Sequence, residues 1–259
     1  MSQSPVFDRY GSISERRKEF LEWLLPELKG DQALKSALDV GCGVGYFSHF
    51  LRGRGLSVTG LDARADNIAE AKKRYPEIPF HVRNVEDPGV PELGTWDMVL
   101  CFGLLYHLEN PFRAIRNLHA LTKQFAVIES MVMPHQSPVA ALIDEVSGED
   151  QGLAYVAFVP SESCLVKMLY RAGFAAVYKP VRMPEHEDFR ASLACRRRRT
   201  VLVASKSEIA SPALVPLVEQ HLVDLWKKKW ANAASRVVRF IRKPMPEKMA
   251  TLKNYGRRW

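Results

Sequence analysis

The sequence has few cysteines and no long apolar run. Its four cysteines, Cys42, Cys101, Cys164 and Cys195, lie far apart and form no CxxC pair. This spacing argues against a disulfide scaffold and a thiolate zinc site, and it favours a reducing cytosol. No uncharged apolar stretch reaches the roughly 18 residues of a transmembrane helix, and we expect no secretory signal and no metal site.

Acidic residues are scarce at the carboxyl end of the chain. The whole sequence has 37 Lys+Arg and 29 Asp+Glu, a net charge of +8. Residues 196–259 hold 16 basic and 4 acidic side chains, hence +12, which leaves −4 on residues 1–195. Hydrophobic residues make up 47% and charged residues 25%; these values exclude wholesale disorder and fibrous classes. The asymmetry bears on binding partners rather than on the fold.

Predicted strands and helices alternate along the middle of the chain. A helix is expected between residues 12 and 28. Apolar patterns then predict strands at 37–40, 56–61, 80–82, 96–102, 125–129, 174–178 and 200–204, with helices at 46–52, 65–74, 111–121 and 161–172. This alternation predicts a Rossmann-like α/β fold, a doubly wound and mostly parallel sheet of seven strands with helices on both faces.

Three parts of the chain are distinguished by their patterns. Residues 1–30 are interpreted as an arm and a helix, 31–205 as the main domain, and 206–259 as a basic extension. Within the domain, residues 131–160 break the alternation with three prolines and two glycines; an insertion after a late strand lies at the ligand-binding edge, so we predict a substrate cover. Residues 183–199 are expected to form an exposed loop. In the extension, apolar residues recur every three or four positions from Leu214, which predicts amphipathic helices.

The most informative motif is Asp39-Val40-Gly41-Cys42-Gly43-Val44-Gly45, at the end of the first predicted strand. Glycines allow a tight turn and let a ligand lie against bare main chain, and the helix that follows aims its N–H groups at an anionic group. Asp62 ends the next strand, seventeen residues after Gly45. A carboxylate there can accept hydrogen bonds from both hydroxyls of a ribose, so the motifs predict an adenosine-bearing cofactor.

The spacing of the glycines distinguishes between cofactors. The loop reads GxGxG, and Tyr46 stands where the nicotinamide fingerprint GxGxxG has its last glycine. Asp39, two residues before the first glycine, can receive the ammonium of an amino acid, which a dinucleotide lacks. Together these features favour S-adenosyl-L-methionine, with the glycine loop facing its methionine part and Asp62 its ribose.

Residues 36–130 resemble the core of the class I S-adenosylmethionine-dependent methyltransferases. LDVGCGVG resembles their first motif, Asp62 their ribose-binding acid, and WDMVLCFGLLYHLENP their fourth-strand motif. Residues 36–205 are also similar to the branch that contains the tRNA wobble-uridine carboxymethyltransferases. In that branch an arginine-rich signature follows the YH pair, whereas Leu108-Glu109 follow it here, and we expect ordinary methyl transfer.

The motifs and the resemblance imply a set of site residues. Asn84-Val85-Glu86 stand where the family holds adenine, although Glu86 could equally be a loop carboxylate. The predicted cofactor-binding residues are Asp39, Gly41, Cys42, Gly43, Gly45, Tyr46, Asp62, Ala63, Asn84, Val85, Glu86, Cys101, Phe102 and Gly103.

Residues near the fourth strand and in the N-terminal arm are candidates for catalysis and acceptor binding. His107 is the candidate general base, because a neutral imidazole there could remove a proton from an oxygen acceptor; alternatively it caps the next helix or fixes the loop. Tyr106 and Tyr10 are candidate substrate-binding residues. The alternatives are a core aromatic for Tyr106 and a disordered arm for Tyr10.

The predicted function is methyl transfer to an oxygen of a small molecule, sugar or lipid-linked metabolite. RNA base methylation and a cofactor-binding scaffold without turnover are the alternatives. Arg196–Arg199 is most simply a solvated loop, and Lys227–Lys229 the wet face of a helix flanked by Trp226 and Trp230. That helix could instead contact nucleic-acid phosphates or the inner membrane face, or pack against the domain or a second subunit. We expect a cytoplasmic protein.

Overall fold

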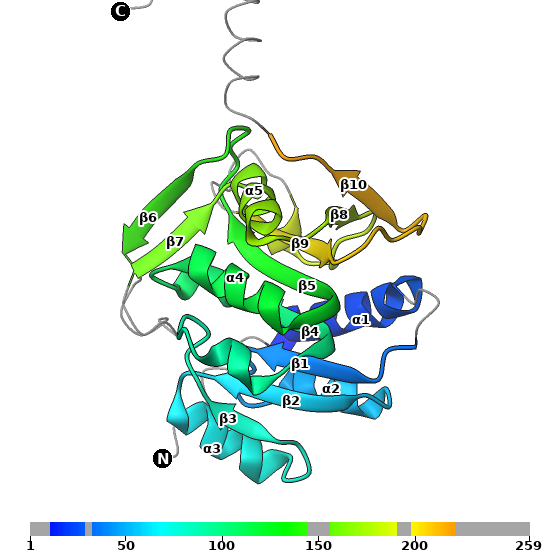
Figure 1. The fold of residues 1–259 in the computed structure, drawn as a ribbon, viewed down its shortest axis with the longest axis vertical. Coiled ribbons are helices and arrows are strands. Elements are labelled where there is room, and N and C mark those ends of the chain that lie inside the picture. The colour runs from blue at the N-terminus through cyan, green and yellow to red at the C-terminus, as the bar shows by residue number, and fades with distance from the viewer. Residues whose placement is uncertain (1–10, 29–32, 145–155, 191–197, 221–259) are drawn as a thin grey trace, which may run out of the picture. The chain divides into compact units, whose positions relative to one another are not determined.

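The computed structural model describes residues 11–28, 33–144, 156–190 and 198–220 (Figure 1). The chain divides into two compact units, Met1–Glu219 and Gln220–Trp259, and every described helix and strand belongs to the first unit. Within the described ranges, no helix is both long enough and apolar enough to span a bilayer.

The first unit is built on an eight-stranded sheet with the order β10-β8-β9-β5-β4-β1-β2-β3. The neighbours β5, β4, β1, β2 and β3 pair in parallel. Because β8 and β5 are both antiparallel to β9, β8 runs in the same direction as these five, while β9 and β10 run opposite. The strands are β1 (Ser36–Val40), β2 (Ser57–Asp62), β3 (Phe80–Val82), β4 (Trp96–Phe102), β5 (Thr122–Val132), β8 (Ala176–Pro180), β9 (Arg198–Ser205) and β10 (Leu214–Leu217).

Helices cover both faces of this sheet, which confirms the predicted doubly wound fold. Side chains alternate along each strand: Leu100 of β4 packs in the cluster that includes α1, α2 and α3, whereas its neighbour Val99 packs in the cluster that includes α4 and α5. Figure 1 shows α4 and α5 together on one face of the sheet. The helices are α1 (Gly11–Glu27), α2 (Tyr46–Gly53), α3 (Ala65–Arg74), α4 (Pro111–Leu121) and α5 (Glu162–Ala172), with short 3-10 helices η2 (Val90–Leu93), η3 (Leu105–His107) and η4 (Glu187–Phe189).

Local signals set the helix ends. The Ser161 side chain accepts a hydrogen bond from the backbone N of Cys164 at 3.1 Å and so caps α5. Gly173 ends α5 with φ 114°, the left-handed conformation that favours glycine. Asn110 caps α4 in the same way as Ser161, accepting from the N of Arg113 at 3.0 Å.

Two predicted segments differ from the structure. Leu214–Leu217 forms a strand rather than the start of a helix, and it gives the sheet its eighth strand. Strand β10 pairs with the otherwise open edge of β8, and Tyr170 donates its hydroxyl to the Leu217 carbonyl at 2.6 Å. These tertiary bonds outweigh the helical spacing of the apolar residues. The helices predicted beyond residue 220 lie outside the described residues.

The segment 131–160 also has more regular structure than its composition predicts. Strand β5 continues to Val132, and β6 (Ala140–Asp144) pairs with β7 (Val156–Pro160) as an antiparallel two-stranded sheet. Strand β7 contacts η3, the segment that carries Tyr106 and His107. In the predicted loop 183–199, η4 buries Phe189, and Arg199 belongs to β9.

Candidate cofactor and acceptor site

The predicted cofactor residues converge at one edge of the sheet. Strand β1 lies between β4 and β2. The chain continues from β1 to β2 and β3 on one side, and β4 and β5 then follow on the other side of β1. Ligands of such sheets bind at this switch point, outside the carboxyl ends of the strands. The glycine loop follows β1, Asp62 ends β2, and Gly103 follows β4.

The backbone of the glycine loop adopts conformations that favour glycine. Gly41, Gly43 and Gly45 have φ values of 74°, 53° and 87°, which side chains rarely adopt. The N–H of Gly43 donates to Asp62 Oδ2 at 2.9 Å, which joins the loop to the end of β2. Gly45 is the N-cap of α2 and no side chain caps that helix, so the loop leads directly into a helix N-terminus suited to an anionic group.

Two carboxyl groups flank this loop in different environments. Asp39 is 2% exposed, and its Oδ2 accepts from the hydroxyl of Ser48 at 2.7 Å. Burial raises the pKa of Asp39 to about 7, and the charge of Asp62 acts in the same direction, against the bonds from Ser48. Asp62 Oδ1 accepts from the backbone N of Arg64 at 2.8 Å and from Asn67 at 3.2 Å. The pair of acids fits a ligand with both an ammonium and a ribose.

The loop after β3 is fixed by three side chains. The Asn84 side chain accepts from the N of Glu86 at 3.0 Å, and Asn117 donates to the Val85 carbonyl at 2.7 Å. Glu86 accepts from the backbone N of Asn110 at 2.5 Å. Glu86 therefore has the loop role that the sequence left open, and adenine contact by Asn84, Val85 and Glu86 stays a prediction.

The remaining cofactor candidates line the same edge. Cys42, Cys101 and Phe102 are buried, and burial raises the pKa of both thiols. Ala63, directly after Asp62, is half-buried. Tyr46 donates its hydroxyl to Glu15 of α1 at 2.5 Å. Burial and this bond raise the pKa of Tyr46, and the same bond lowers the pKa of Glu15, so Tyr46 ties α1 to the glycine loop.

The two candidates for acceptor chemistry share η3. Tyr106 is buried, and its ring centroid lies 4.1 Å from that of His107. Burial raises the pKa of Tyr106. Asn110 provides the side-chain cap of α4, and the role of His107 as general base stays a prediction. Tyr10 lies outside the described residues.

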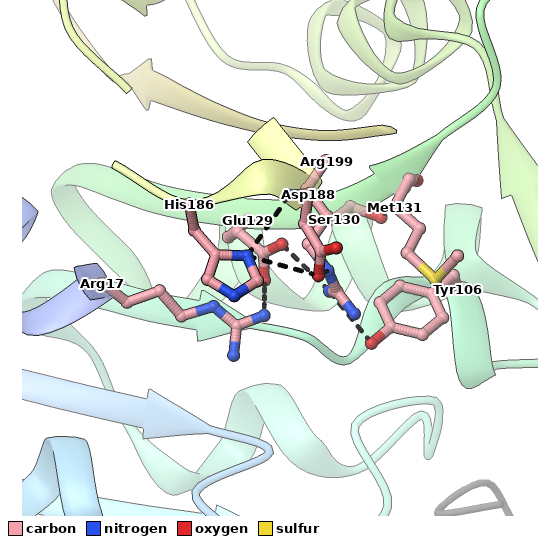
Figure 2. A network of polar contacts seen from close by, with 8 residues as sticks. All are labelled: Arg17, Tyr106, Glu129, Ser130, Met131, His186, Asp188 and Arg199. Carbon is pink, nitrogen blue, oxygen red and sulfur yellow. Dashed lines mark hydrogen bonds and ion pairs between the residues drawn. The ribbon is translucent and has the colours of Figure 1, made fainter. Parts of the chain in front are cut away.

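A buried ion network lies beside Tyr106 (Figure 2). Glu129 of β5 is fully buried and accepts from Arg17 Nη2 at 2.7 Å through Oε2 and from Arg199 Nη1 at 3.1 Å through Oε1. Arg199 also donates to the Tyr106 hydroxyl at 3.2 Å and to Asp188 at 3.2 Å. We call Arg17, Glu129 and Arg199 the ion triad.

The solvated-loop interpretation of Arg199 is wrong. Its side chain is only 13% exposed, because β9 pairs with β5 as far as the partners Val132 and Arg198. Strand alternation then places Arg199 on the same face as Val201 and Val203. Burial lowers the pKa of Arg199, but Glu129 and Tyr106 raise it by more, so the guanidinium stays charged.

Sequence reasoning did not identify the ion triad. The signal that could have revealed it is Glu129, a charge in the middle of the apolar strand FAVIESMV, because a buried carboxylate requires charged partners. The sequence does not indicate which residues pair with Glu129, since Arg17 is 112 residues away along the chain. Among the residues that the structure describes, no group of three or more His, Cys, Asp or Glu could hold a metal ion.

The fold, the glycine loop and the two placed acids define the class I, Rossmann-like methyltransferases. Residues 12–179, more than half of the chain, match the family model described as "Methyltransferase domain". The chain therefore belongs to the methyltransferase-domain family, whose class I members depend on S-adenosylmethionine.

Curated relatives and solved structures agree with this family. The chain is 33% identical over 107 residues to a ubiquinone biosynthesis O-methyltransferase of Sodalis glossinidius, covering 40% of this chain and 43% of the relative. It is 28% identical over 171 residues to a tRNA U34 carboxymethyltransferase of Desulfotalea psychrophila, covering 63% and 51%. The chain thus spans about half the length of these relatives, or less.

Two solved structures share the fold at low identity. The N-terminal domain of EvdMO1 with SAH bound has a TM-score of 0.59 at 20% identity, over 79% of this chain and 82% of that one. Magnesium protoporphyrin IX methyltransferase from Synechocystis PCC 6803 with bound SAM has a TM-score of 0.53 at 20% identity, over 79% and 92%.

Proposed function

We propose that the chain transfers a methyl group from S-adenosyl-L-methionine to an oxygen of a small molecule, sugar or lipid-linked metabolite. The observation that carries the proposal is the positive-φ glycine loop between Asp39 and Asp62 at the switch point of the sheet, in a chain that belongs to the methyltransferase-domain family. When bound, the cofactor supplies a methyl group already activated on a sulfonium.

The chain's own residues must bind the cofactor and the acceptor, orient them and exclude water. Such positioning can lower a reaction barrier by about 7–11 kcal/mol in favourable cases. Asp39 would hold the ammonium of the cofactor, Asp62 its ribose hydroxyls, and the glycine loop would lie against its methionine part. Strand β7 contacts η3, which supports the hairpin β6–β7 within 131–160 as a cover over the acceptor.

His107 would act as the general base. It lies in η3, directly after Tyr106 and close to the end of β4, where it could take the proton from an acceptor hydroxyl. A positioned base of this kind contributes about 10²–10⁴-fold. Retention of full turnover by His107→Ala at every pH would remove this role.

The proposal is tested in two steps. Calorimetry of the full chain should show binding of S-adenosylhomocysteine and of the cofactor, weakened in Asp62→Ala and unchanged in Asp66→Ala, an exposed acid of the next helix. Transfer of a labelled methyl group is then screened against phenols, sugars, lipid extracts and RNA. Saturation by NADH with no heat from either sulfur compound would overturn the assignment of the cofactor.

RNA is the second candidate acceptor. Two observations favour it: the similarity to tRNA U34 carboxymethyltransferases and the +12 charge of residues 196–259. Methyl transfer to RNA should fall with rising salt and with removal of residues 220–259, whereas transfer to a small molecule should keep its rate. A scaffold protein would bind the cofactor and show no transfer to any acceptor.

A further inference from the structure

We propose that Asn117 of α4 is a positioning residue for cofactor binding. It fixes the loop after β3, residues 84–87, in the shape that receives the adenine ring of the cofactor. The inference rests on the proposed methyl transfer and deepens it. Three observations carry it: both hydrogens of the Asn117 amide bond to this loop, α4 holds the same loop at a second point, and the loop lies beside the predicted ribose acid.

The first observation is the bonding of the Asn117 amide. Asn117 is 7% exposed, and its Nδ2 donates to the Val85 carbonyl at 2.7 Å and to the Asp87 carbonyl at 2.9 Å. An amide nitrogen carries two hydrogens, so both are used. The two acceptors stand on either side of Glu86 in the sequence. One side chain therefore fixes the course of the backbone through the loop.

The second observation is another contact between α4 and the same loop. Glu86 accepts from the backbone N of Asn110, the N-cap of α4, at 2.5 Å. Positions seven residues apart are about two turns apart and share one face of a helix, and Asn110 and Asn117 have this spacing. Helix α4 thus holds the successive residues Val85, Glu86 and Asp87 from a single face.

The amide of Asn117 is an exception on the inner side of α4. The side chains beside it are apolar and fully buried in one cluster: Ala114, Ile115, Leu118 and Leu121. A buried amide contributes little net stability, because its hydrogen bonds replace bonds to water. A leucine would also fill this position, but it would leave the directions of the two loop carbonyls unspecified. Fixing these directions is what the amide adds.

The third observation is the place of the loop in the sheet. Strand β3 pairs in parallel with β2, and Asp62 pairs with Val82. The backbone N of Arg83 donates to the Asp62 carbonyl at 2.9 Å, so the loop begins directly beyond the predicted ribose acid. A nucleoside whose ribose is held by Asp62 would therefore place its base beside residues 84–87. Backbone groups select one base over another only when their directions are fixed beforehand.

The competing explanation is that Asn117 only fastens α4 to the loop after β3. Both explanations predict a change in the free energy of unfolding when the amide is removed, so stability cannot separate them. Only a positioning role predicts that the chain loses its preference for adenine over another purine of the same shape.

The experiment compares two ligands of the full chain by calorimetry. One is S-adenosylhomocysteine, and the other is S-inosylhomocysteine, in which an oxygen replaces the amino group of adenine and N1 gains a hydrogen. Both have the same ribose and amino acid, so the ratio of their affinities reports the contacts of the base alone. We expect the wild type to bind the adenine ligand at least about tenfold more tightly, and Asn117→Leu to lower this ratio several-fold.

Two further variants separate positioning from folding. Asn117→Leu nearly keeps the side-chain volume and suits its apolar neighbours. Asn117→Ala removes the same two hydrogen bonds without adding atoms, and it should lower the ratio in the same direction. Leu121→Ala is the matched control, because Leu121 is fully buried in the last turn of the same helix. It should reduce the free energy of unfolding and keep the wild-type ratio.

The possible failures have different meanings. A wild-type ratio near one, or an unchanged ratio in Asn117→Leu or Asn117→Ala, would overturn the positioning role. An equal fall of the ratio in Leu121→Ala would also overturn it, because the effect would then follow stability alone. Failure of S-adenosylhomocysteine to bind the wild type would overturn the proposed function instead, so the two failures are distinguishable.

Discussion

Single residues of the site have properties that differ sharply from those of the free amino acids. Burial raises the pKa of Asp39 to about 7, against about 3.9 in an unfolded chain. Between about pH 4 and 7 the folded chain therefore binds more protons than the unfolded one, and the free energy of unfolding falls as pH rises through this window. We expect Asp39→Asn to gain stability relative to wild type on going from pH 4.5 to pH 8, measured by urea denaturation of both proteins. A difference that does not change with pH would contradict this.

Cofactor binding should respond in the opposite direction to the same substitution. If Asp39 holds the ammonium, Asp39→Asn loses a charged partner and should bind S-adenosylhomocysteine at least about tenfold more weakly at pH 8. Near pH 5, where Asp39 is already protonated, the two proteins should differ less. Calorimetry at both pH values measures this, and Asp66→Asn serves as the control because Asp66 lies in α3 and pairs with Arg64.

Substitutions of Gly41 and Gly55 distinguish the effect of backbone strain from that of side-chain crowding. Gly41 has φ 74°, and a Cβ there would lie 3.0 Å from the Leu104 side chain; Gly55 has φ 86° with nothing within 4 Å. Left-handed conformation costs about 1–2 kcal/mol for a residue with a Cβ. Gly55→Ala should lose about this much free energy of unfolding, and Gly41→Ala more. Only Gly41→Ala should also weaken cofactor binding. Equal effects of the two on both measurements would place the loop away from the cofactor.

At the scale of elements, α1 is held to the sheet by apolar contact as well as by Arg17. Leu21 and Leu24 are fully buried, and truncation of such a leucine costs about 2–5 kcal/mol. We expect Leu24→Ala to lose this amount in urea denaturation. Glu19→Ala, whose side chain is 53% exposed, should change stability by about 0.5 kcal/mol or less. Similar values for the two variants would mean that α1 contributes little to the folded core.

The elements that the sequence predicted well are those whose signal is local. The glycine loop and the helices predicted at 46–52 and 161–172 depend on neighbouring residues, and they appear as the loop after β1, as α2 and as α5. Strand β10 was not predictable in this way. Its pattern of Leu214 and Leu217 also suits a helix, and the deciding factor is the open edge of β8, which is formed by residues far away in the sequence.

The candidate site also contains some residues with a local sequence signal and others without one. The residues of the cofactor loop are close in sequence or occupy fixed positions after consecutive strands, so motif spacing brought them together. The ion triad joins α1, β5 and β9, and its members are 112 and 70 residues apart. Arg17 and Arg199 are neighbours only because α1 packs on the face of the sheet where β5 and β9 pair, and no local pattern encodes this packing.

At the scale of the whole molecule, the positive charge lies in the second of the two compact units. Residues 220–259 contain 11 basic and 2 acidic side chains, hence +9, whereas residues 1–219 contain 26 and 27, hence −1. The boundary at Glu219 falls after β10. Residues 220–259 can therefore be removed while β10, the strand that completes the sheet, is kept.

This separation gives a test of what each part does. A chain that ends at Glu219 should keep the free energy of unfolding and the cofactor affinity of the full chain. A chain that ends at Ala210 loses buried Leu214 and the Tyr170–Leu217 hydrogen bond, which should cost about 2–4 kcal/mol. Urea denaturation measures both. If residues 220–259 contact RNA phosphates, the slope of log affinity against log salt should be steep for the full chain and shallow for 1–219. Equal slopes would exclude residues 220–259 from RNA binding and remove the charge argument for an RNA acceptor.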